Sequence, residues 1–64
     1  MTINDIRLAV QKIRECADDD EMAHSKEDDL YIAVLKAIAD GKAGPRHAAE
    51  ALKAQAIDFA RYCS

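Results

Sequence analysis

Glu21 and His24 form a Glu-x-x-His pair, the arrangement by which some helical proteins bind iron or manganese. On one helix, side chains three residues apart share a face, and carboxylate-bridged di-metal bundles use such pairs as ligands. Those sites also need glutamates from facing helices, so a single pair supplies half of the ligands at best. Glu21 and His24 are therefore weak metal candidates. The favoured interpretation is a polar helix start with a surface histidine and no cofactor.

The acidic run from Asp18 to Asp29 has the length of a calcium-binding loop, but its pattern excludes that function. Met22, Ala23 and Lys26 would occupy the fifth, sixth and ninth loop positions, where ligands or glycine belong.

His24 also has two acids one turn away, Glu27 and Asp28, and such a group could serve acid–base chemistry. The sequence offers neither an accompanying nucleophile nor an oxyanion-stabilising motif. We therefore expect no catalytic residues and a protein that is not an enzyme.

Negative charge is concentrated in residues 15–30, where eight acids against Lys26 give a net charge of −7. The segments 1–14 and 41–64 each carry +2, and the whole chain carries −3. An acidic patch beside basic ends suits a protein partner or self-association. The candidate partner-binding residues are Asp18, Asp19, Asp20, Glu21, Glu27 and Asp28. Helix caps and a solvated surface are the alternative role for them.

Basic residues near and within the third predicted helix offer a different function, nucleic-acid binding. They are Lys42, Arg46, Lys53 and Arg61. No helix-turn-helix pattern or aromatic platform accompanies them, so a nucleic-acid-associated regulator is kept only as an alternative.

Three helices must position these residues, because the chain is rich in alanine, leucine and isoleucine and lacks strand patterns. We predict them over about residues 3–17, 20–40 and 45–62. Thr2 is a plausible N-cap for the first. The second starts near Asp20, with Ser25 as a rival start, and Gly41 ends it. Pro45 suits the first position of the third.

Each predicted helix has an apolar face at helical spacing. In the first it comprises Ile3, Ile6, Val10, Ile13 and Ala17. In the second it comprises Tyr31, Val34, Leu35 and Ile38, widened by Leu30, Ala33 and Ala37. In the third it comprises Ala49, Leu52, Ala56, Phe59 and Cys63.

The fold class that follows is all-α, a small three-helix bundle in a single domain of 64 residues. A chain of this size buries only about 60% of its unfolded surface, so we expect it to share its core in a homodimer. No apolar run is long enough for a membrane span and no secretion signal is present. We therefore expect a cytoplasmic location, with Cys16 and Cys63 as reduced thiols.

Four segments carry a further pattern. They read His24-Ser25-x-Glu27-Asp28-x-Leu30-Tyr31, Ala37-Ile38-Ala39-Asp40-Gly41, Ala51-Leu52-Lys53 and Ile57-Asp58-Phe59-Ala60-Arg61-Tyr62-Cys63. With them the chain resembles a family of small phage and bacterial proteins of uncharacterised function that often end in a Phe-Ala-Arg-Trp-Cys-like segment, with Tyr62 in place of the tryptophan. The resemblance implies a phage or prophage accessory protein in the host cytoplasm, without catalytic residues or a cofactor. By analogy, it would regulate or inhibit a host protein by binding it.

Overall fold

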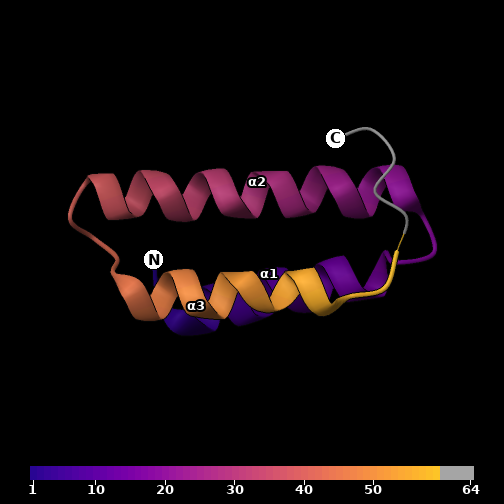
Figure 1. The fold of residues 1–64 in the computed structure, drawn as a ribbon, viewed down its shortest axis with the longest axis horizontal. Helices are drawn as coiled ribbons and strands as arrows, with labels where there is room; N and C mark the ends of the chain where they lie inside the picture. Colours follow the sequence, from indigo (N-terminus) through magenta and orange to yellow (C-terminus); the bar gives the residue numbers. More distant parts are fainter. Residues whose placement is uncertain (60–64) are drawn as a thin grey trace.

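Three α-helices and one short 3-10 helix form the protein in a computed structural model, which describes residues 1–59 (Figure 1). The helices are α1 (Ile3–Glu15), α2 (Asp20–Ala39), α3 (Pro45–Leu52) and the 3-10 helix η1 (Lys53–Ala56). α2 runs antiparallel to α1 and α3, which lie side by side. The all-α, three-helix prediction is confirmed over these residues, and sharing of the core in a homodimer stays a prediction.

α1 begins with a reciprocal cap between Thr2 and Asp5. The Asp5 backbone N–H donates to the Thr2 hydroxyl at 3.1 Å, and the Thr2 N–H donates to the Asp5 carboxylate at 2.8 Å. This backbone hydrogen bond from Thr2, and then its hydroxyl, lowers the pKa of Asp5. α1 ends at Glu15, two residues before the predicted end at Ala17, because the aspartates that follow would oppose the negative end of the helix.

α2 begins at Asp20, as the longer of the two predicted helices requires. Asp19 is its N-cap, and the Asp19 carboxylate accepts the Met22 N–H at 3.2 Å. α2 ends at Ala39, one residue earlier than predicted, and Gly41 follows with a φ of 74°. The Lys42 N–H donates to the Ala37 carbonyl at 2.8 Å, which closes a Schellman motif.

α3 is shorter than the predicted helix over 45–62, which is wrong for residues 53–59. The α-helix ends at Leu52, η1 tightens the next turn, and Ile57 is extended. In a continuous helix Ile57 and Phe59 would point about 200° apart. By leaving the helix the chain buries both side chains against the other helices. Residues 60–62 of the predicted helix lie outside the described residues.

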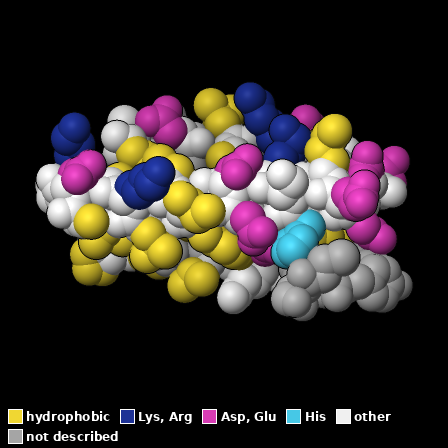
Figure 2. Space-filling model, turned by 90° about the horizontal axis from the view of Figure 1, so that it is seen from above, with side chains coloured by type: hydrophobic (Ala, Val, Ile, Leu, Met, Phe, Trp, Pro, Cys, Tyr) yellow, Lys and Arg dark blue, Asp and Glu magenta, His cyan; other side chains and the backbone are white. Residues whose placement is uncertain are grey.

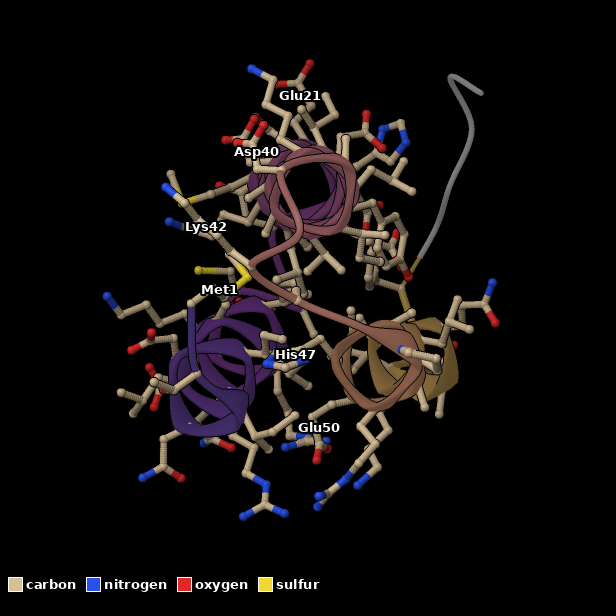
Figure 3. The ribbon with its side chains drawn as sticks, turned by 90° about the vertical axis from the view of Figure 1, so that its left-hand side faces the viewer. Met1, Glu21, Asp40, Lys42, His47 and Glu50 are labelled. Carbon is tan, nitrogen blue, oxygen red and sulfur yellow. The ribbon has the colours of Figure 1, made fainter. Side chains whose placement is uncertain are left out.

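The core lies along the axis of the three-helix triangle that Figure 3 shows from one end. Its buried apolar residues are Ile6, Val10, Ile13, Ala23, Leu30, Val34, Ala51, Ala54, Ile57 and Phe59. The predicted α1 face is confirmed at Ile6, Val10 and Ile13, because its 3-4 spacing keeps these side chains in one row.

The predicted apolar faces of α2 and α3 are partly wrong. Leu35 is 65% exposed and Leu52 is 51% exposed, although both were assigned to the core. Leu30, which belonged to the predicted face of α2, is buried, and on α3 the buried apolar residue is Ala51. Apolar residues cover more than half of the circumference of α2, so their spacing does not select a single face. Only the sector that faces both α1 and α3 is buried.

A buried carboxylate joins α1 to α3. Glu50 accepts from the Lys53 ammonium at 2.6 Å and from the Arg7 guanidinium at 3.1 Å, and its side chain is only 10% exposed. The Lys53 hydrogen bond, followed by that from Arg7, lowers the pKa of Glu50 against the opposing effect of burial. Among residues 1–59, no buried side-chain nitrogen or oxygen lacks a hydrogen-bond partner.

Candidate functional site

A groove between α2 and α3 is the clearest candidate site. It has a volume of about 300 Å³. The residues that line it are Tyr31, Val34 and Leu35 from α2, and Ala48, Ala51 and Leu52 from α3. Among residues 1–59, no charged side chain lines this groove. In Figure 2 apolar side chains gather along the lower left edge of the molecule, where α2 meets α3.

The groove exists because its two walls differ in the size of their side chains. α3 contributes Ala48 and Ala51, whose short side chains leave space beside α2. Leu35 and Leu52 stand at the two rims and extend into solvent. Contiguous exposed apolar surface of this kind marks interaction sites on small proteins. This site was missed from the sequence, because the spacing predicted that both leucines would be buried.

The α2 wall of the groove continues toward the N-terminus of α2 as a polar stripe. Its members recur at spacings of three and four residues and therefore share one face of the helix. The stripe comprises Glu21, His24, Asp28, Tyr31 and Leu35. His24 is half-buried, and its Nε2 lies 3.7 Å from a carboxylate oxygen of Asp28, which is exposed. Along this face α2 thus changes from acidic to apolar.

The residues of the predicted acidic contact surface are not all exposed. Asp18, Asp20, Glu21 and Asp28 are exposed, as a contact surface requires. Asp19 is also exposed, but its carboxylate caps α2 and has a structural role.

Glu27 is a wrong member of that predicted surface. It is 4% exposed, and one of its carboxylate oxygens accepts a hydrogen bond from the Tyr31 hydroxyl at 2.8 Å. The core side of α2 carries Ala23, Glu27, Leu30 and Val34 in one row, which places this carboxylate inside the bundle. A buried carboxylate cannot contact a partner without rearrangement, so Glu27 is removed from the candidate surface.

The weak metal candidates do not meet further ligands in the described part of the chain. Glu21 points away from α1 and α3, on the outer side of α2 (Figure 3). Over residues 1–59, no group of three or more histidine, cysteine, aspartate or glutamate side chains is placed to hold a metal ion. A di-metal site would need glutamates from facing helices, and the outer side of α2 faces none of them.

The basic residues of the nucleic-acid alternative are dispersed. Lys53 pairs with Glu50, whereas Lys42 follows the end of α2 and lies on a different side of the bundle from Glu50 (Figure 3). Arg61 and Cys63 lie outside the described residues. His47 is half-buried, and its Nδ1 accepts the Gly44 N–H at 3.1 Å.

Comparison with known proteins found no matching family model, no matching curated protein and no matching solved structure. None of the helices within residues 1–59 combines the length and the apolar character needed to cross a membrane.

Proposed function

We propose that this protein acts by protein–protein binding, as a small phage-type accessory protein that regulates or inhibits a host protein. The α2–α3 groove is its docking surface. The single observation that carries the proposal is the pair of exposed leucines, Leu35 and Leu52, on either side of an apolar groove. An apolar groove rimmed by large exposed side chains fits the recognition of another protein better than chemistry, which needs converging polar groups.

Burial of the two exposed leucines by a partner would contribute substantially to the free energy of binding. Full burial of a leucine side chain is favourable by about 1.5–3 kcal/mol. Leu35 and Leu52 are 65% and 51% exposed, so a partner that covers both gains about 2–4 kcal/mol from them together. Micromolar affinity needs about 8 kcal/mol, so the two leucines would supply a quarter to a half of it.

A matched set of variants tests the groove. Leu35→Glu and Leu52→Glu place a charge in the groove, whereas Leu8→Glu places one on the outer face of α1, where the leucine is 62% exposed. Each protein is immobilised, and proteins captured from host extract are identified by mass spectrometry. Circular dichroism checks that each variant keeps its helical content.

We expect one dominant partner that the wild type and Leu8→Glu capture and that both groove variants lose. If all three variants retain the same partner, the groove is not the docking surface. If Leu8→Glu alone loses it, the docking surface lies on α1. Asp20→Lys and Glu21→Lys test the acidic surface in the same assay and leave the Asp19 cap intact.

A further inference from the structure

His47 fastens the turn between α2 and α3 to the first turn of α3. Its Nδ1 accepts the Gly44 N–H at 3.1 Å, and the Gly44 carbonyl accepts the N–H groups of His47 and Ala48 at 3.0 and 3.2 Å. Gly44 is the N-cap of α3 and has no side chain with which to cap the helix. The His47 ring therefore holds the helix start to the N-cap, as a glutamate or glutamine does in a capping box.

The hydrogen bond from Gly44 to His47 exists only while the imidazole is neutral. A backbone N–H is a donor, so Nδ1 must offer a lone pair and the ring proton must lie on Nε2. In the imidazolium both ring nitrogens carry a proton, and neither can accept. A positive charge in the first turn also opposes the positive end of the helix dipole. Protonation of His47 therefore weakens the start of α3 in two ways.

The carboxylate nearest along the same face of α3 is already occupied. His47 and Glu50 are three residues apart, and Arg7 of α1 contacts Glu50, so this face is turned toward α1. Figure 3 shows His47 and Glu50 between the two helices. Glu50 accepts from both Arg7 and Lys53. It therefore offers little to a protonated ring at position 47.

The remaining charged groups at this end of the bundle do not compensate either. α1 and α3 begin where α2 ends (Figure 1). The groups there are the Met1 amino group and Asp5 at the start of α1, Lys36 and Asp40 near the end of α2, Lys42 in the turn and Arg46 beside His47. Cations outnumber acids among them, Asp5 is bound to Thr2, and Asp40 is exposed. Within residues 1–59, no carboxylate forms an ion pair with His47.

We propose that His47 is a proton-sensitive joint between the α2–α3 turn and α3. Neutral His47 holds the first turn of α3 to Gly44, and protonated His47 releases it. Histidine side chains ordinarily change charge between about pH 5 and 8. The stabilisation from this hydrogen bond is therefore present above that range and is lost as pH falls through it. The pKa of Glu50 is lowered from its ordinary value of 4.5, so its own effect appears only in stronger acid.

Variants of the two histidines test this joint, since His24 and His47 are the only histidines of the chain. His47→Gln supplies a side-chain oxygen that can accept the Gly44 N–H whatever the pH, and His47→Ala supplies none. His24→Gln is the matched control, because His24 lies on α2 with its Nε2 3.7 Å from Asp28. Two-dimensional NMR follows the backbone amides from pH 8 to 5, and thermal unfolding gives Tm at pH 7.5 and 5.5.

We expect the Gly44 amide resonance to move with pH in the wild type and in His24→Gln, and to stay nearly fixed in both His47 variants. Gly41 is the internal reference, because its N–H donates to the Ile38 carbonyl. Between pH 7.5 and 5.5 the wild type should lose about 2–6 °C more in Tm than His47→Gln. His47→Ala should have a lower Tm than His47→Gln at pH 7.5 and an equally weak dependence on pH.

Three results would overturn the joint. If the Gly44 resonance stays fixed in the wild type, or moves equally in the His47 variants, protonation of this ring does not reach the turn. If the wild type and His47→Gln lose the same Tm between the two pH values, the hydrogen bond is not proton-sensitive. If His24→Gln rather than His47→Gln removes the pH dependence, the sensitive contact lies on α2.

Discussion

Replacing Asp19 with alanine tests whether this acid of the Asp18–Asp20 run stabilises α2 as its N-cap. The Asp19 carboxylate accepts the Met22 N–H at 3.2 Å and caps the 20-residue helix α2. Loss of such a cap costs about 1 kcal/mol, within a range of about 0.5–2. For a domain of this size, 1 kcal/mol lowers Tm by about 4–8 °C.

Two companion variants separate the effect of losing the cap from the effect of losing the charge. Asp18→Ala removes the same charge one residue earlier, in the exposed turn, and should change stability by less than about 0.5 kcal/mol. Asp19→Asn keeps the cap and should stay close to the wild type. Thermal unfolding followed by circular dichroism measures all three. Equal losses in Asp18→Ala and Asp19→Ala, or in Asp19→Asn and Asp19→Ala, would show that charge rather than capping governs this position.

Three further predictions concern the core, the α2–α3 turn and the α1–α3 contact. Ile13→Ala should cost about 2–5 kcal/mol in urea unfolding, because Ile13 is 1% exposed, whereas Leu8→Ala should stay within about 0.5. Gly41→Ala should cost about 1 kcal/mol, measured by thermal unfolding, through its φ of 74° alone, since its surroundings have room for a Cβ. The pKa of Glu50 is lowered in the folded state, so its contribution is present at neutral pH and lost as pH falls below its ordinary value of 4.5. Glu50→Gln should therefore lower Tm at pH 7 and flatten the decline of Tm with acid; an unchanged slope would contradict this assignment.

The features that the sequence predicted well depend on neighbouring residues. Thr2, Asp19 and Gly41 each act within one turn of chain, through a side-chain cap or a left-handed backbone. The longer α2 helix follows from the same local logic, because aspartates favour the positive start of a helix and oppose its end. The α1 face was predictable because its apolar residues form a single narrow row.

The features that the sequence did not predict depend on how the helices meet. Leu35 and Leu52 belong to the predicted apolar faces, but the packing of α2 against the small side chains of α3 leaves both at the rim of a groove. Glu27 belongs to an acidic run, yet it is buried because it lies on the same face of α2 as Ala23, Leu30 and Val34. α3 ends at Leu52 because the segment after it is buried against the other helices. Helix propensity depends on residue type alone and does not predict this burial.

Photo-crosslinking tests the central claim, docking at the α2–α3 groove, most directly. A benzophenone amino acid replaces Leu35 in one protein and Leu8 in another, since both leucines are about equally exposed. After irradiation in host cells, the account predicts one adduct from position 35, larger than twice the 7.0 kDa of the chain, and none from position 8. An adduct from position 8 without one from position 35 would contradict the account.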